Sequence, residues 1–70
     1  MTDGIVIQVN GENRETPVGI SVVGLLEQLG LNRGRVAIEY NLQILPKEKW
    51  EATQIAAGDR LEIVQFVGGG

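Results

Sequence analysis

Between residues 5 and 9 every second position is isoleucine or valine. This period of two is typical of a β-strand with one buried face. Asn10-Gly11 follows, and the pair favours a two-residue type I′ turn because both turn positions need a positive φ. The pattern therefore predicts a β-hairpin whose return strand covers residues 13–16 and ends at Pro17, which has no N–H to donate to a neighbouring strand.

The next stretch has the period of an amphipathic helix. Apolar side chains recur at the i, i+3, i+4 and i+7 positions of one helix face, at Val22, Leu25, Leu26 and Leu29. Ser21 is a good N-cap, and Gly30 stands where a glycine commonly closes a helix. Gly24 inside the helix costs up to about 1 kcal/mol relative to alanine. A close approach of the helix to the sheet would explain this glycine.

The second half of the chain predicts further strands and a short irregular segment. Alternation over residues 36–40 predicts a strand, and residues 43–45 are a short apolar piece stopped by a proline. Residues 47–52 can form one helical turn that places Trp50 in the core. The final strand is predicted to run over residues 61–67.

This order of elements predicts an α+β fold of the β-grasp (ubiquitin-like) kind. A right-handed crossover places the one main helix on one face of a mixed sheet of four to five strands. The first and last strands then lie side by side in the middle, and the C-terminus leaves the sheet as a tail. We expect one β-grasp domain over residues 1–67 and a flexible glycine tail over residues 68–70.

Composition excludes several classes of function. The 70 residues contain no histidine and no cysteine, which removes the usual general base, the common nucleophile pairs and zinc sites built on imidazole or thiolate. A net charge of −3 disfavours nucleic acid as a partner, and no apolar run is long enough to cross a membrane. We expect a cytoplasmic protein that is monomeric when free, is not itself an enzyme and binds no cofactor tightly.

The C-terminal Gly68-Gly69-Gly70 is the most informative feature. Glycine has no Cβ, so such a backbone can lie in a narrow channel and approach a nucleotide closely. Three extended residues reach about 10 Å, enough to place the Gly70 carboxylate inside a partner's active site. ATP can activate that carboxylate as an acyl-adenylate, which a sulfur or nitrogen nucleophile then attacks. A floppy tail or a cloning remnant is the alternative interpretation.

A break of phase in the last strand predicts a docking surface. Val64 and Phe66 fall on the side of the strand opposite Leu61 and Ile63, and we expect them outside, near Val6 of the first strand. Exposed apolar side chains beside the tail would mark a contact for a partner, so Phe66, Val64 and Val6 are the predicted docking residues and Phe66 should be partly exposed. A β-bulge or twist that turns these side chains inward is the alternative.

Two other groups of residues are interpreted as structural. The lysines beside Trp50 suggest a recognition loop, but a solvated face with a core tryptophan is the simpler interpretation. The carboxylates have no metal-loop spacing. Glu39 and Glu62 could attract basic partners, although ordinary surface charge also accounts for them.

Five stretches of the sequence together carry a family resemblance. They are Ile7-Gln8-Val9-Asn10-Gly11, Ser21-Val22-Val23-Gly24-Leu25-Leu26, Asn41-Leu42-Gln43-Ile44-Leu45-Pro46 with Trp50, Gly58-Asp59-Arg60-Leu61-Glu62-Ile63 and the terminal glycines. With these stretches, the fold order and the tail, the sequence resembles the ThiS family, the sulfur carrier proteins of thiamine biosynthesis. The resemblance covers essentially the whole chain. It departs from the family at Lys47, where arginine is common, and in having a third terminal glycine.

The resemblance implies a specific mechanism and specific partners. An E1-like adenylyltransferase that uses ATP and Mg would adenylate the Gly70 carboxylate. Sulfur from a cysteine-derived persulfide would then give a thiocarboxylate, and thiazole synthase would take that sulfur. Gly68 and Gly69 would be the threading residues, with Val64 and Phe66 as docking candidates.

Three rival functions stay open on the sequence. One is the small subunit of molybdopterin synthase, against which the segment 41–50 speaks. Another is a ubiquitin-like modifier that forms isopeptides with lysine. The third is an interaction module whose tail is inert.

Overall fold

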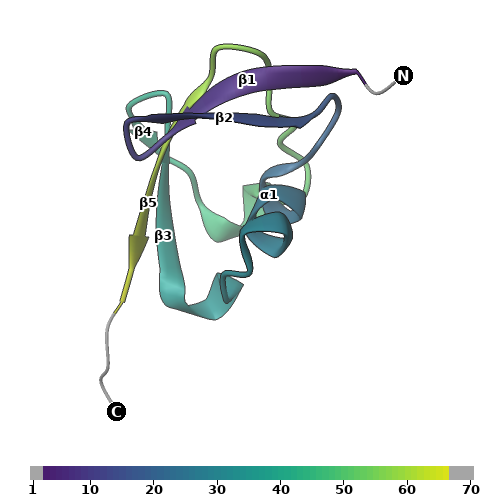
Figure 1. The fold of residues 1–70 in the computed structure, drawn as a ribbon. Helices are drawn as coiled ribbons and strands as arrows, with labels where there is room; N and C mark the ends of the chain where they lie inside the picture. Colours follow the sequence, from purple (N-terminus) through teal and green to yellow (C-terminus); the bar gives the residue numbers. More distant parts are fainter. Residues whose placement is uncertain (1–2, 67–70) are drawn as a thin grey trace.

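The computed structural model describes residues 3–66. Their strands form one mixed sheet in the order β2-β1-β5-β3-β4, and α1 packs on one face of it (Figure 1). The elements are β1 (Gly4–Val9), β2 (Glu12–Pro17), α1 (Val22–Leu29), β3 (Val36–Tyr40), β4 (Gln43–Ile44) and β5 (Arg60–Gln65). The first and last strands are parallel neighbours in the centre, so the β-grasp prediction is confirmed.

The β1–β2 hairpin has the predicted turn. Asn10 has φ 52° and Gly11 has φ 82°, as a type I′ turn requires. The return strand is longer than predicted, because β2 includes Pro17, which pairs with Gly4. A proline is tolerated there because β2 is an edge strand of the sheet.

Both ends of α1 are capped as the sequence predicts. Ser21 Oγ accepts the Gly24 N–H at 3.0 Å, and Gly30 adopts φ 72° at the C-terminal end. The expected explanation of Gly24 is wrong. A Cβ at this position would lie 3.0 Å from Cγ1 of Ile20, so the crowding comes from the residue before the helix cap and not from the sheet.

The segment between β4 and β5 is less helical than predicted. Only Lys47–Lys49 form a 3-10 turn. The core position of Trp50 is confirmed: its side chain is 2% exposed, and its indole N–H donates to the Leu45 carbonyl at 2.8 Å. The last strand is also shorter than predicted, since β5 ends at Gln65 and Val67 lies outside the described residues.

The hydrophobic core of the described residues lies between α1 and the sheet. It consists of Ile7, Val9, Val22, Leu25, Leu26, Val36, Ile38, Trp50, Ile55, Leu61 and Ile63.

No helix within residues 3–66 has the length and apolar character needed to span a bilayer.

Candidate functional site

The predicted tail residues Gly68, Gly69 and Gly70 lie outside the described residues. The structure does place the point from which they continue. Phe66 directly follows β5, and its N–H donates to the Arg35 carbonyl at 2.8 Å. The chain is therefore hydrogen-bonded to its neighbouring segment as far as Phe66.

The outer face of β5, opposite α1, is apolar at this end of the sheet. Val64 is 57% exposed and Phe66 is 58% exposed, whereas Leu61 and Ile63 are buried against the helix side. The predicted exposure of Phe66 is therefore confirmed, and the phase break is not a bulge that turns the side chains inward. Exposed large apolar side chains gathered in one place are typical of contact surfaces.

Val6 does not belong to this group, and the expectation that it lies near Val64 and Phe66 is wrong. Val6 is 53% exposed on the same face, but its carbonyl accepts the Gly58 N–H at 2.9 Å. Gly58 precedes Val64 by six residues, which is about 20 Å along a strand. Because β1 runs parallel to β5 with Gln8 in register with Arg60, Val6 lies beyond the start of β5, at the opposite end from Phe66.

The structure instead adds two apolar residues that sequence reasoning missed. Leu42 is 74% exposed and Ile44 is 79% exposed, both in the β3–β4 hairpin. Ile44 and Val64 line a shallow hollow of about 150 Å³ on the outer face. We call Ile44, Val64 and Phe66 the outer apolar patch. Leu42, at the hairpin turn, lines a different hollow together with Gln8 and Arg60.

The sequence held only a weak signal for these two residues. Ile44 pairs with Glu39 across β3–β4, and Val64 pairs with Ala37 across β3–β5. These two pairings place Ile44 and Val64 on the same face of the sheet, and the strand pairing that does so is visible only in the tertiary structure. Leu42 has φ 72°, a conformation that leucine rarely adopts, and its exposure at a turn tip is visible only in the structure.

Two carboxylates border the outer apolar patch. Glu39 and Glu62 are directly opposite each other on β3 and β5, and both side chains line the same hollow as Ile44. Like charges in this arrangement repel each other. A basic side chain of a partner would relieve that repulsion, so the hollow fits an apolar contact flanked by lysine or arginine.

A polar cluster at the turn of the β3–β4 hairpin is structural. The Asp59 carboxylate accepts hydrogen bonds from the Tyr40 hydroxyl, from the Asn41 amide at 3.2 Å and from the Ala56 N–H at 2.7 Å. Burial alone would raise the pKa of Asp59, but the hydrogen bonds from Tyr40, Ala56 and Asn41 together lower it. Burial, and then the hydrogen bond to Asp59 and its charge, raise the pKa of Tyr40 to about 12. These groups hold the hairpin against the turn before β5.

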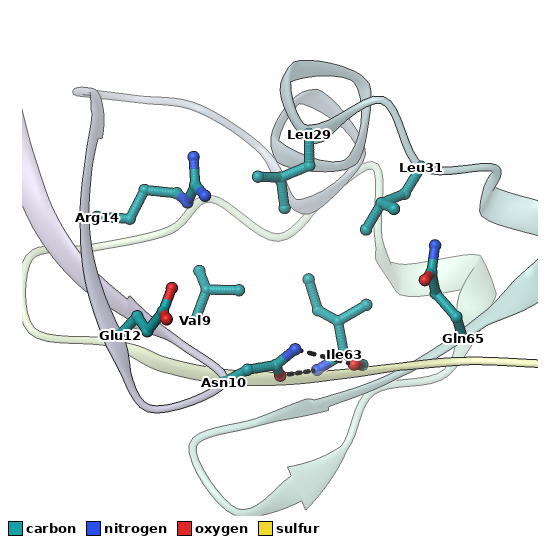
Figure 2. Close-up of a pocket in the computed structure, with 8 residues that line it drawn as sticks. All are labelled: Val9, Asn10, Glu12, Arg14, Leu29, Leu31, Ile63 and Gln65. Atoms are coloured by element: carbon teal, nitrogen blue, oxygen red, sulfur yellow. Dashed lines mark hydrogen bonds between the residues drawn. The ribbon is translucent and has the colours of Figure 1, made fainter.

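A second hollow, of about 290 Å³, lies on the helix side of the sheet. Figure 2 shows the side chains of Leu29 and Leu31, at the end of α1 and just after it, facing those of Val9 and Ile63. The remaining lining residues are polar: Asn10, Glu12, Arg14 and Gln65.

The Asn10 side chain in this hollow continues the sheet. Its Oδ1 accepts the Ile63 N–H at 2.7 Å and its Nδ2 donates to the Ile63 carbonyl at 3.2 Å (Figure 2). The amide therefore takes the place of a strand partner for β5 just where β1 turns away. Sequence reasoning identified Asn10 only as a turn residue.

Comparison with known proteins places this arrangement in context. The model of the ThiS family matches residues 7–70. A thiazole synthase from Paramagnetospirillum magneticum is 44% identical over 62 residues, which are 89% of this chain and 19% of that protein, so the chain spans about a fifth of its length. The sulfur carrier protein ThiS of Escherichia coli is 33% identical over 91% of this chain and 97% of that protein. The crystal structure of the thiamine biosynthesis protein ThiS from Geobacter metallireducens matches with a TM-score of 0.81 and 30% identity, over 94% of this chain and all of that one.

Proposed function

This chain belongs to the ThiS family of sulfur carrier proteins of thiamine biosynthesis, and we propose that it carries sulfur as a thiocarboxylate on Gly70. A globular body over residues 1–67 docks on each partner, while the glycines 68–70 extend into the partner's active site. The chain supplies the acyl group, and the partners supply the catalysts.

The chemistry proceeds in three balanced steps. The Gly70 carboxylate attacks the α-phosphorus of ATP bound with Mg to an E1-like adenylyltransferase, which forms an acyl-adenylate and releases pyrophosphate. A persulfide sulfur then attacks the acyl carbon and displaces AMP. A thiol reductant cleaves the resulting acyl disulfide and leaves the thiocarboxylate, whose sulfur passes to thiazole synthase.

The observation that carries this proposal is the position of the outer apolar patch. Val64 and Phe66 are more than half exposed at the end of β5 from which the chain continues to Gly70. A partner that covers this patch holds the body next to the start of the tail, so a few extended residues suffice to reach its active site. The absence of cysteine from the sequence leaves no side-chain persulfide as an alternative carrier.

Thiazole synthase as the sulfur acceptor is supported by the relatives. In Paramagnetospirillum magneticum a protein of that name contains a segment 44% identical to this chain. Two activities joined in one polypeptide commonly act on the same intermediate, and here that intermediate is the proposed thiocarboxylate. We propose that thiazole synthase contacts this domain through the outer apolar patch.

The test is intact mass spectrometry after incubation of the chain with ATP, Mg, an E1-like enzyme and a persulfide donor. We expect the C-terminal peptide to gain the mass of an oxygen-to-sulfur exchange. A variant extended by one alanine after Gly70 should gain none, because its glycine carbonyl is an amide and its new carboxylate lies one residue further on, next to a Cβ that a narrow channel excludes. Sulfur incorporation into the extended variant would disprove the proposal, and conjugates to lysine in place of sulfur would indicate a modifier.

A further inference from the structure

The two edges of β5 differ in their hydrogen bonding. Even-numbered residues face β3: the Arg60 carbonyl accepts the Asn41 N–H at 2.8 Å, and the Phe66 N–H donates to Arg35. Odd-numbered residues therefore face the side of β1, where the Leu61 carbonyl accepts the Asn10 N–H at 2.9 Å. On this second edge, β5 continues beyond the last residue of β1 that pairs with it.

The second edge is open at Gln65. β1 ends at Val9, in register with Leu61, and the Asn10 side chain then covers Ile63. The next odd residue is Gln65, and within residues 3–66 no strand is in register with it on this side. Its N–H and carbonyl point along the edge where a further strand could pair.

The helix-side hollow lies directly beside this open edge. Gln65 lines it together with Val9, Leu29, Leu31 and Ile63 (Figure 2). A strand edge next to an apolar hollow is the arrangement in which an added strand binds: main-chain hydrogen bonds give affinity, and alternate side chains fill the pocket. Glu12 and Arg14 at the rim have opposite charges, so the hollow favours an uncharged aliphatic side chain.

We propose that an extended segment of thiazole synthase pairs with the open edge of β5 at Gln65 and places an aliphatic side chain in the helix-side hollow. The inference rests on the proposed function and adds a second contact to it. Gly70 follows Gln65 by only five residues, about 17 Å of extended chain. A protein that takes Gly70 into its active site therefore surrounds the continuation of this strand edge, and pairing at Gln65 fixes the register with which the tail enters.

The matched variants are Gln65→Pro and Gln65→Ala. Proline removes the Gln65 N–H, which has no partner strand within residues 3–66, so both variants should have the same unfolding free energy. We expect Gln65→Pro to bind thiazole synthase about tenfold or more weakly by titration calorimetry, because one main-chain hydrogen bond is lost and the ring obstructs the edge. Gln65→Ala should bind like the unaltered chain.

Amide hydrogen exchange gives a measurement that needs no variant. In the free chain the Gln65 amide should exchange fast and the Phe66 amide slowly, since within residues 3–66 only the Phe66 amide is bonded to a neighbouring segment. Binding of thiazole synthase should slow the exchange of the Gln65 amide. A complex that forms without slowing that exchange overturns the inference. So does a Gln65→Pro variant that binds normally but loses self-association in light scattering, because the edge then pairs with a second copy.

Failure of this inference is distinguishable from failure of the proposed function. If the unaltered chain gains no sulfur in the mass assay, the proposed function is wrong regardless of Gln65. If it gains sulfur but Gln65 is not protected in the complex, only the added strand is wrong.

Discussion

At the scale of single residues, two asparagines combine turn formation with long-range contacts. Asn10 and Asn41 have φ of 52° and 51°, and each begins a two-residue hairpin turn. Their side chains also bind β5: Asn10 contacts the Ile63 main chain, and Asn41 Oδ1 accepts the Arg60 N–H at 2.9 Å. Asparagine suits both tasks because it tolerates a positive φ and offers a donor and an acceptor.

We predict that Asn10→Gly lowers the unfolding free energy by about 2 kcal/mol. Glycine keeps the turn geometry, so the loss comes from the two hydrogen bonds to Ile63, each worth about 1 kcal/mol. Asn10→Asp keeps the acceptor and loses the donor, so it should not retain full stability. Urea denaturation measures all three proteins, and an Asn10→Gly variant as stable as the unaltered chain would show that Asn10 serves only the turn.

The Tyr40–Asp59 contact predicts a dependence of stability on pH. The pKa of Asp59 is lowered in the folded state, so its contribution is present above the unfolded pKa of about 4 and is lost as pH falls through the lower folded value. Tyr40→Phe removes one donor and should cost about 1 kcal/mol at pH 7. The unfolding free energy of Tyr40→Phe should fall less steeply than that of the unaltered chain as the pH is lowered from 7 to 2, as measured by denaturation at each pH. An equally steep fall for both proteins would contradict this prediction.

At the scale of elements, the β3–β4 hairpin gives up stability at its tip. Leu42 occupies a left-handed conformation with φ 72° and leaves its side chain exposed, where glycine or asparagine would be favoured. Ile44, two residues further on, extends the apolar surface of β5 across β3. Leu42 itself lies beside Gln8 and Arg60, at the end of β5 away from Phe66.

We predict that Leu42→Gly stabilises the fold by about 0.5–1 kcal/mol and leaves binding to the E1-like enzyme unchanged. The first effect follows from relief of the positive φ, and the second from the position of Leu42 beside Arg60, at the far end of β5 from Phe66. Ile44→Ala is the matched variant, because it removes an apolar contact from the outer apolar patch without relieving strain and should weaken binding only. Thermal denaturation and titration calorimetry separate the two effects. Weaker binding by Leu42→Gly would place Leu42 on the contact surface.

At the scale of the whole molecule, the chain is a small body with its contact surfaces at one end. The outer apolar patch lies on one face of β5 and the open edge at Gln65 lies on one side of it, both close to where the chain continues to the glycines. The opposite end of the sheet holds Val6 and the start of β1. This polarity predicts that substitutions affect partner binding according to their distance from Phe66.

We predict that Val64→Ala and Phe66→Ala each weaken binding to the E1-like enzyme by about five- to tenfold, with Phe66→Ala the larger effect. Val6→Ala is a matched control, because Val6 is equally exposed on the same face but lies at the far end. All three should keep the unfolding free energy nearly unchanged, since their side chains are more than half exposed. Equal losses of affinity for Val6→Ala and Val64→Ala would contradict the expected dependence of binding on distance from Phe66.

The sequence by itself determined the features that depend on neighbouring residues. The hairpin turn at Asn10-Gly11, the helix between Ser21 and Gly30, and the outward side of Phe66 are set by local dihedral preferences and by side-chain period. It also determined the order of elements, and from that the fold. These features were predictable because each involves residues only a few positions apart.

Only the tertiary structure decided which exposed residues lie together. Strand pairing joined Ile44 to the surface of Val64 and separated Val6 from it, and a hydrogen bond across 53 positions made Asn10 a partner of Ile63. The same pairing left the edge of β5 open at Gln65, because β1 turns back two odd positions earlier. Register between distant segments depends on packing of the whole core, so it has no local signature in the sequence.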